Sequence, residues 1–502
     1  MAVVDVRGKT VVITVLTLVI VECVSLLAFV FTPLQPLVFG AVVIAAFLLS
    51  LWKPAAGVWI MLSELVVGGK GYLFSIPVGT IDISIRLGIF VAVLLAIIPR
   101  YAFTDRRKLF RIPYALWWWL AVFTVVYGVA LGVGYKNPPS SVFLDANGYL
   151  FLAAAVPFFL IVKNRSEINK VFNVFIGALF FVTAKTFFVL LYFAHTASED
   201  ALRTVYSWIR VTGVGEITQF SLGWYRIFFQ SHVFALMALF VSMWLLSDRV
   251  LCTASKVTRR VLWLLIGCSV FILIVSFSRS FWLAAGLTAF LSLVYLLRTR
   301  GWKLVSVLRP LAIGFGIVVA ELAIVTFLVN LPVGRGGGGV STISIIKERF
   351  SGGTEEVALS SRLNLLKPLT KKALEQPFFG WGFGTTVTYQ TKDPRAAQGA
   401  GGLYTTYAFE WGYLDFVVKL GMIGALVFSL FPLSVLFSSI RGLRTATREE
   451  HLFILGITFA VIALLLTHAT TPYLNHPLGI GYLLFLATCS AVLTSGAQRS
   501  HE

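Results

Sequence analysis

Four arginines and one glutamate stand at positions where side chains could act on an anionic substrate. Arg279 lies in the short segment "SFSRSFW" between two long apolar runs, and Arg226 lies in "GWYRIFFQSH" just before another such run. Arg210 belongs to the same polar segment as Arg226, whereas Arg362 and Glu410 belong to a longer polar segment nearer the C-terminus. A guanidinium matches phosphate oxygens with two parallel hydrogen bonds, where a lysine acts as a point charge. The set therefore predicts binding of a phosphate or diphosphate group.

The elements that must position these side chains are apolar helices. Of the 502 residues, 58% are hydrophobic and only 13% are charged, and the mean hydropathy is +0.88. A soluble domain carries about 25% charged residues. Several apolar runs reach the roughly 20 residues that a helix needs to cross a bilayer, and none shows the period-two alternation of a membrane strand. We predict an all-α polytopic membrane protein.

We expect about 12–14 transmembrane helices on this length criterion. The third candidate is short enough to be re-entrant. The fourteen candidate spans are residues 11–31, 35–52, 55–68, 84–99, 114–134, 148–162, 171–193, 229–247, 261–277, 280–297, 310–330, 412–438, 451–468 and 473–495.

Basic residues occupy every second loop between these spans, which sets the orientation, because cytoplasmic loops carry an excess of lysine and arginine. Both termini are predicted to be cytoplasmic. The clusters are Arg106 to Lys108 with Arg111; Lys163, Arg165 and Lys170; Arg249, Lys256, Arg259 and Arg260; Arg298, Arg300, Lys303 and Arg309; and Arg441, Arg444 and Arg448.

This orientation places all five candidate residues outside the cytoplasm. They fall in the segment 195–229, in the turn 276–280 and in a large loop, 331–411. The expected organisation is a bundle of about 11 spans over residues 1–330, an extracytoplasmic catalytic loop over 331–411, and three further spans with a cytoplasmic tail over 412–502. The net charge of +19 then reflects basic loops beside anionic lipid headgroups rather than nucleic-acid binding.

The large loop contains a predicted helix followed by a glycine-rich turn. "GRGGGG" at 334–339 is typical of a linker or hinge. "QPFFGWGFG" predicts a turn where the backbone approaches another segment closely. Between them, Pro368 is expected to limit or kink a helix at the outer membrane interface. Its predicted apolar stripe is Leu359, Leu363, Leu366, Thr370 and Ala373.

Less specific interpretations of these charges stay open. The lysines of the loop helix could extend to lipid headgroups. Arg279 could form a structural ion pair or a headgroup anchor, and Glu410 could be a carboxylate at the membrane edge paired with a loop lysine.

Four segments resemble the O-antigen ligase/polymerase superfamily, bacterial membrane glycosyltransferases of the GT-C type that use polyprenyl-diphosphate-linked glycans. "VSFSRSFWLAAG" is similar to its Ser-Arg turn, and "SSRLNLLKPLTKKALEQPFFGWGFG" to its outer-loop helix with a Pro-x-x-Gly-x-Gly turn. "YLDFVVKLGMIGALVF" resembles the start of its next span, and "IFFQSHVFALMAL" the entry to an earlier one. Together the segments cover about residues 210–440.

The resemblance implies transfer of a glycan from polyprenyl (undecaprenyl) diphosphate to the hydroxyl of a glycan or lipid-glycan acceptor, at the outer face of the bacterial cytoplasmic membrane. Arg279 and Arg362 would stabilise the leaving diphosphate, with Arg210 and Arg226 as helpers. Glu410 would act as the base. The outer loops carry no Asp-x-Asp or other convincing metal-binding acidic motif, so the sequence calls for no metal or cofactor.

One position departs from the family pattern. Ligases of the family usually carry a His-Asn pair eleven and ten residues before the first glycine of a Leu-Gly-x-x-Gly step. Counting back from Gly421 gives Glu410 and Trp411 here. The choice between ligase, polymerase and protein glycosyltransferase therefore stays open.

A transporter or flippase and a membrane protease are the two alternative functional classes. A transporter or flippase for a lipid-linked or anionic substrate would also have many spans, and Glu22, Lys185 and Glu321 fall within predicted spans. Transporters usually show internal repeats and charged midplane helices, whereas most polar residues here lie in the outer loops. A membrane protease is disfavoured because His-Glu-x-x-His and Gly-x-Ser-x-Gly are both missing from the sequence.

The orientation leads to a first prediction. A cysteine introduced at Ser351 should react with a membrane-impermeant thiol reagent in intact cells, after the outer membrane has been permeabilised if there is one. Labelling that appears only after lysis of the cytoplasmic membrane would contradict the predicted topology.

Overall fold

Long apolar helices dominate the computed structural model, which describes residues 4–104, 112–221, 224–247, 255–299, 304–333, 357–391 and 402–498. Within these ranges, twelve helical segments are long and apolar enough to cross a membrane, which confirms the prediction of an all-α polytopic membrane protein. They are α1 (Gly8–Val30), α2 (Leu34–Trp52), α4 (Ile85–Thr104), α6 (Tyr114–Gly134), α7 (Pro139–Leu150) continued by η1 (Phe151–Ala154) and α8 (Ala155–Ile161), α9 (Arg165–His195), α12 (Lys256–Ser276), α13 (Arg279–Thr299), α14 (Leu304–Val329), α17 (Gly412–Gly442), α18 (Arg448–Thr470) and α19 (Pro477–Gln498). The predicted hinge at 334–339 and Ser351 lie outside the described residues.

Two of the fourteen predicted spans correspond to helices too short to cross the bilayer core alone. These are α3 (Pro54–Val67) and α11 (Val233–Leu246), which follows the short turn η2 (Gln230–His232). Each has 14 residues, or about 21 Å at 1.5 Å per residue, against a hydrocarbon thickness of about 30 Å. Both helices are largely buried by their neighbours.

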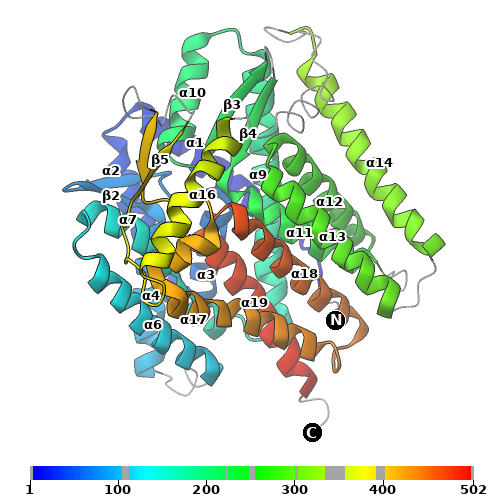
Figure 1. Ribbon diagram of the computed structural model, residues 1–502. Helices are drawn as coiled ribbons and strands as arrows, with labels where there is room; N and C mark the ends of the chain where they lie inside the picture. Colours follow the sequence, from blue (N-terminus) through cyan, green and yellow to red (C-terminus); the bar gives the residue numbers. More distant parts are fainter. Residues whose placement is uncertain are drawn as a thin grey trace.

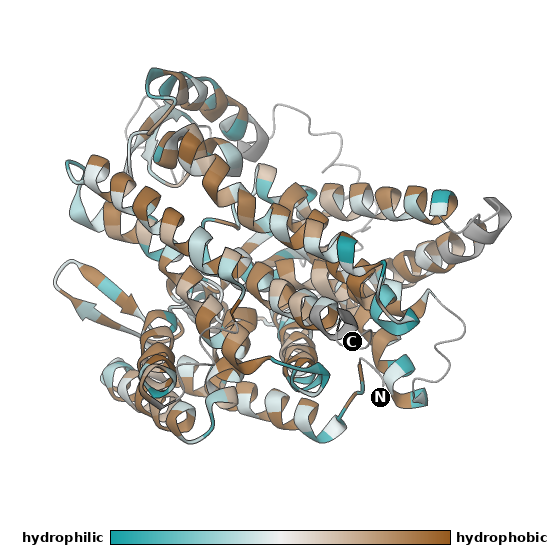
Figure 2. Ribbon diagram, turned by 90° about the horizontal axis from the view of Figure 1, so that it is seen from below, coloured by the Kyte–Doolittle hydropathy of each residue, from teal (hydrophilic) through white to brown (hydrophobic). Residues whose placement is uncertain are grey.

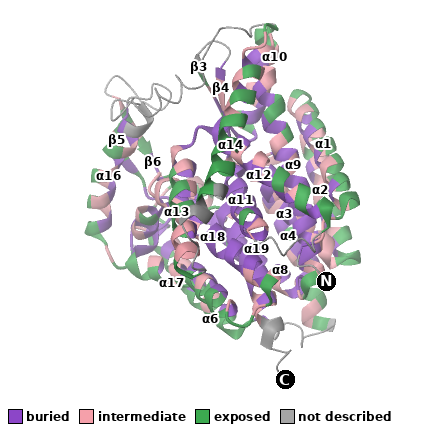
Figure 3. Cartoon of the chain, turned by 90° about the vertical axis from the view of Figure 1, so that its right-hand side faces the viewer, coloured by how far each residue is buried: buried purple, intermediate pink, exposed green. Residues whose placement is uncertain are grey.

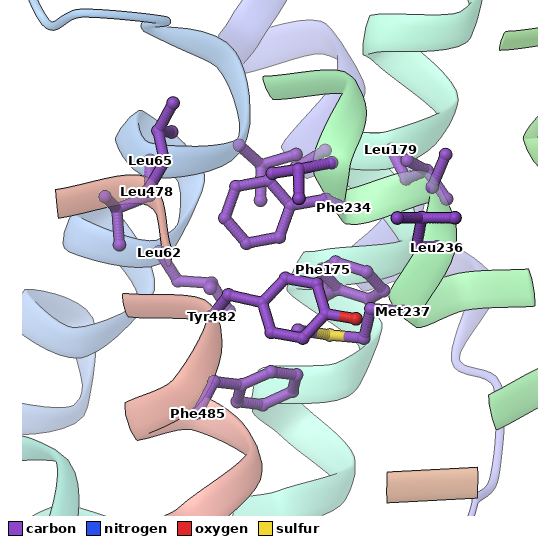
Figure 4. Packing of buried hydrophobic residues seen from close by; sticks show 14 of the residues in the cluster. Leu62, Leu65, Phe175, Leu179, Phe234, Leu236, Met237, Leu478, Tyr482 and Phe485 are labelled. Atoms are coloured by element: carbon purple, nitrogen blue, oxygen red, sulfur yellow. The ribbon is translucent and has the colours of Figure 1, made fainter. Parts of the chain in front are cut away.

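The centre of the bundle is a hydrophobic core around α11. This helix packs against α12 and α18, and its Phe234 ring stacks on Tyr482 of α19 with the centroids 5.7 Å apart. Figure 4 shows these rings beside Phe175, Met237 and Phe485. Buried residues concentrate in the centre of the bundle, and exposed ones along its periphery (Figure 3). Figure 2 shows hydrophobic residues all along the long helices, including their outward sides, as contact with lipid requires.

Short helices and two-stranded hairpins lie in the segments between the long helices. They are the hairpin β1 (Ser75–Val78) with β2 (Ile81–Ser84), helix α10 (Glu199–Val211), the hairpin β3 (Gly215–Ser221) with β4 (Trp224–Phe229), helix α16 (Val357–Glu375), and the hairpin β5 (Val387–Gln390) with β6 (Leu403–Thr406). In Figure 1, α10, β3 and β4 lie at one end of the molecule, and both chain termini lie toward the other. Which end faces the cytoplasm stays a prediction.

Helix α16 corrects the apolar stripe expected from its sequence. The side chains buried against the protein are Leu365, Leu369 and Ala373, which pack with Phe409 and Val418 in a small separate cluster. Leu363 is exposed, and Leu366 and Thr370 are only partly buried, so the prediction was wrong at these three positions and right at Ala373. Leu359 lies outside the residues whose side chains the structure describes. Leucines occur at helical spacing on two faces of α16, and the sequence pattern alone did not tell which face meets the protein. The helix also continues through Pro368 to Glu375.

The glycine-rich turn that follows α16 fits against a break in α17. At Gly421, φ is 71° and ψ is 174°, so helical hydrogen bonding is interrupted. The N–H of Met422 instead donates to the carbonyl of Pro377 at 2.7 Å, and the N–H of Trp381 donates to the carbonyl of Val418 at 2.7 Å. The turn thereby satisfies backbone groups that the broken helix would leave unpaired. The predicted close backbone approach is confirmed.

The same turn is held against α6 and α7. Gly382 has φ 76°, and a Cβ atom placed on it would lie 2.2 Å from the backbone nitrogen of Gly134 at the end of α6. The N–H of Gly384 donates to Asp145 Oδ2 of α7 at 2.9 Å. The glycines of "FFGWGFG" are thus required where three helices converge on one turn.

A second prediction concerns Gly382→Ala. The change forces a left-handed backbone on alanine and a collision with α6, and should cost about 2 kcal/mol of stability or more. The matched control is Gly128→Ala on α6, where no atom lies within 4 Å of the added methyl group. Thermal unfolding of the detergent-solubilised proteins should show a lower Tm for the first variant alone. Equal melting of both variants would contradict the described packing.

Candidate active site

Two of the predicted site residues form a direct ion pair. Arg362 Nε of α16 donates to Glu410 Oε2 at 2.6 Å, although the two residues are 48 positions apart. The side chains are 31% and 47% exposed, so the pair is accessible from outside the protein. Beside it, the indole N–H of Trp411 donates to the carbonyl oxygen of Arg362 at 2.9 Å. This bond ties α16 to the start of α17.

Arg226, on β4, is held from two sides. Its Nε donates to the carbonyl oxygen of Ser276 at 2.7 Å, and its guanidinium lies 4.8 Å from the ring centroid of Phe228. Burial lowers the pKa of Arg226 to about 10, with Glu216 acting in the opposite direction and the positive charge of Arg362 lowering it further. The group remains protonated at neutral pH, but its positive charge is poorly solvated.

Arg279 begins α13, directly after the tight turn that ends α12. Phe277 in this turn adopts a left-handed conformation with φ 45°. The hydroxyl groups of Thr470 and Thr471 both donate to Ser280 Oγ at 2.9 Å, which joins the turn to the end of α18. The charge of Arg362 acts on Arg279 as it does on Arg226.

Arg362 therefore lies within electrostatic reach of both Arg226 and Arg279, and Arg226 is bonded to Ser276 in the turn just before Arg279. Arg362 is the common neighbour of Arg226 and Arg279, and Glu410 is the carboxylate bonded to it. The three guanidinium charges exceed the two negative charges of Glu410 and Glu216, which leaves an excess of positive charge. An anion with several oxygens would relieve the repulsion among the guanidinium groups.

The helper role of Arg210 stays a prediction, and the structure gives its present partner. It lies on α10 and pairs with Glu216 of β3 at 3.2 Å. Glu216 is also the acidic group that acts on Arg226. Arg210 thus connects to Arg226 through the carboxylate of Glu216.

Sequence reasoning missed Tyr473, in the loop between α18 and α19. Its hydroxyl donates to the carbonyl of Gln230 at 3.1 Å, and its ring stacks on Phe281, two residues after Arg279. Burial raises the pKa of Tyr473 well above its usual value, so the hydroxyl keeps its proton. The polar run "TTPYLN" between two apolar spans is the signal that could have pointed to it.

A buried charge network beneath the ion pair was also missed. Lys419 Nζ lies 2.5 Å from Asp145 Oδ1 and 2.5 Å from Asp415 Oδ1, and Asn475 Nδ2 donates to Asp415 Oδ2 at 3.0 Å. Because Asp145 also accepts the N–H of Gly384, the network links α7, α17 and the glycine-rich turn. Buried charges are costly unless they are paired in this way. The signal was Asp415 and Lys419 at i, i+4 in an apolar run.

The charged residues predicted within spans are placed as follows. Lys185 of α9 pairs with Glu22 of α1 at 2.5 Å, and its ammonium group lies near the rings of Trp208 and Phe229. Glu321 of α14 faces a groove that it lines together with Arg260 and Trp263 of α12. Lys185 and Glu22 therefore neutralise each other inside the bundle.

Comparison with known proteins adds an independent finding. Residues 261–429 match the family model described as O-antigen ligase. The matched region runs from α12 past the break in α17, so it includes Arg279, Arg362 and Glu410. No curated protein matches the chain.

The arrangement predicts that the three arginines bind a diphosphate. Arg279→Ala and Arg362→Ala should each weaken the binding of inorganic pyrophosphate by about tenfold or more, because each change removes charge-assisted hydrogen bonds. Lysine should restore binding poorly, since it lacks the bidentate geometry.

Isothermal titration of the purified protein measures this effect. Arg210→Ala, at the position paired with Glu216, serves as the comparison. It should weaken pyrophosphate binding less than the other two changes do. Parent-like pyrophosphate affinity in Arg279→Ala would favour a headgroup or structural role for that arginine.

Proposed function

The chain belongs to the O-antigen ligase/polymerase superfamily, and we propose that it transfers a glycan from a polyprenyl diphosphate donor to an acceptor hydroxyl at the outer face of the bacterial cytoplasmic membrane. The observation that carries the proposal is the set of charges around Arg362, which pairs with Glu410 and lies within electrostatic reach of Arg226 and Arg279. Arg226 is also bonded to Ser276 in the turn before Arg279. These residues come from β4, the α12–α13 turn and α16. The acceptor is a glycan or lipid-glycan.

The arginines act on the leaving group in this mechanism. As the bond between the sugar's anomeric carbon and the diphosphate oxygen breaks, the polyprenyl diphosphate departs with the electron pair and gains negative charge. Preorganised positive groups aimed at such developing charge stabilise the transition state more than the ground state. Arg226 is well suited to this task because Ser276 and Phe228 already hold its guanidinium in place.

Glu410 acts on the acceptor. In the free protein its carboxylate is bonded to Arg362. When the diphosphate takes Arg362 as its partner, the carboxylate becomes available to accept the proton of the acceptor hydroxyl, whose oxygen then bonds to the anomeric carbon. A positioned base of this kind contributes typically about 10²–10⁴-fold to the rate. The ion pair thus couples donor binding to release of the base.

Two structural features weigh against the alternative of a transporter or flippase. Broken helices in transporters leave backbone groups free to bind ions or substrate. The break in α17 is instead filled by the glycine-rich turn, which accepts the N–H groups of Met422 and Ile423. Glu22 and Lys185 likewise form an ion pair with each other.

The proposal is tested with purified protein and a lipid-linked oligosaccharide. A ladder of products would identify a polymerase, and a single transfer to a lipid-glycan acceptor would identify a ligase. Movement of the intact lipid-linked glycan across vesicles without any transfer would support the flippase alternative and refute the proposal.

Glu410→Gln gives the sharpest single-residue prediction. The change keeps size and hydrogen bonding but removes the base, so turnover should fall by about 10²-fold or more while pyrophosphate binding survives. Glu410→His should retain part of the activity, because imidazole can accept the same proton.

The matched control is Glu199→Gln, an exposed carboxylate at the start of α10, which should turn over like the parent. If Glu410→Gln also turns over normally, the base lies elsewhere. If it loses pyrophosphate binding as well, Glu410 has a positioning role only.

A further inference from the structure

Helix α16 presents a second face that the proposed reaction does not use. With 100° between successive residues, Lys367, Lys371 and Leu374 lie opposite the buried Leu365 and Leu369. All three are exposed, Leu374 to 73%. Together with Thr370 and Glu375 they line a shallow concavity. Figure 3 shows α16 at the edge of the molecule with exposed residues along it.

This face continues into the lipid-facing surface of α17. Phe378 and Phe379, just after α16, are each 60% exposed. The carbonyl of Phe378 accepts the N–H of Ile423, so the phenylalanines adjoin α17 where it resumes after its break. Beyond this point α17 exposes Ser434, Ser438 and Arg441. Its other exposed side chains are large and apolar, namely Met422, Ile423, Leu426, Leu430, Leu433, Phe437 and Ile440. One apolar surface therefore runs from the spanning helix to the end of α16.

The length of α17 indicates the depth of this surface. From Met422 to Gly442 the helix is about 31 Å long at 1.5 Å per residue, which matches a hydrocarbon core of about 30 Å. The break at Gly421 then lies near one boundary of the hydrocarbon, and Phe378 and Phe379 lie at that boundary too. Aromatic residues followed by lysines are the expected order of side chains from acyl chains to headgroups.

We propose that the face formed by Lys367, Lys371, Leu374, Phe378 and Phe379 binds the phospholipid surface of the outer leaflet. The apolar side chains enter the acyl region, and the two lysines hold the phosphate of an anionic phospholipid. Around the helix, Arg362 lies about 140° from Lys367 and about 180° from Lys371 at 100° per residue. It is on the side bonded to Glu410. The phospholipid site is therefore separate from the arginine cluster.

This attachment gives α16 a positioning role. One side of the helix packs on α17 through Leu365, Leu369 and Ala373, and the other side rests on the bilayer. The bilayer surface then sets the height of Arg362, which must meet a diphosphate whose polyprenyl chain is in the same leaflet. Anionic phospholipid should stabilise this placement.

A fluorescent label at position 374 tests the proposal without any transfer activity. Leu374→Cys is labelled in a protein whose four native cysteines are replaced by alanine, and reconstituted without polyprenyl lipid. Quenching is compared between spin-labelled phosphatidylglycerol and spin-labelled phosphatidylcholine, each with the nitroxide near the headgroup. The phosphatidylglycerol should be preferred by about tenfold, because each lysine adds attraction to an anionic lipid.

Paired substitutions separate the lysines from general charge effects. Lys367→Gln with Lys371→Gln should abolish the preference for phosphatidylglycerol. Lys136→Gln with Arg203→Gln removes the same number of exposed charges elsewhere and should leave it intact. Equal quenching by both lipids in the parent, or quenching by aqueous iodide instead of lipid, would overturn the proposal. Since no donor is present, these outcomes are independent of whether the glycan-transfer proposal holds.

Discussion

The arrangement of α16 and the glycine-rich turn depends on the break in α17 at Gly421, where this turn pairs with the backbone groups that the break leaves open. The N–H groups of Met422 and Ile423 have no helical acceptor at the break, and the carbonyls of Pro377 and Phe378 take them. An unpaired backbone group at the membrane boundary would cost several kcal/mol. This constraint fixes the glycine-rich turn on α17, and α16 with it. Arg362 lies on α16 and Glu410 directly precedes α17. The two side chains meet because the turn holds these two helices together.

The framework holds two sets of charged side chains, one buried and one partly exposed. Lys419 is buried between Asp145 and Asp415. Its ion pairs with these two carboxylates hold α7, α17 and the turn in one arrangement. Arg226, Arg279 and Arg362 lie near one another with Glu410 as the carboxylate bonded to Arg362. The first set stabilises structure, and we propose that the second binds an anionic ligand.

The parts of this arrangement that the sequence could predict are those with a local signal. Helical spans follow from long apolar runs, and the glycines of "FFGWGFG" predict a close approach of the backbone without naming the partner. Gly421 sits in an apolar run that looks like ordinary helix. Neither the break nor its pairing with Pro377 and Phe378, 45 positions before Met422 and Ile423, could be predicted from it. The buried stripe of α16 was misplaced because its leucines occupy two faces, one for the protein and one that we assign to lipid. Arg210 was grouped with Arg226 by proximity in the chain, whereas α10 and β3 place Glu216 between them.

The central claim is that the three arginines form one diphosphate site beside Glu410, and a cryo-EM map of the protein in nanodiscs with undecaprenyl diphosphate would test it most directly. We expect density for the diphosphate in contact with Arg226, Arg279 and Arg362, with the Glu410 carboxylate released from Arg362. A diphosphate bound elsewhere, for example at the basic loops on the opposite side of the bundle, with the Arg362–Glu410 pair intact, would contradict the account.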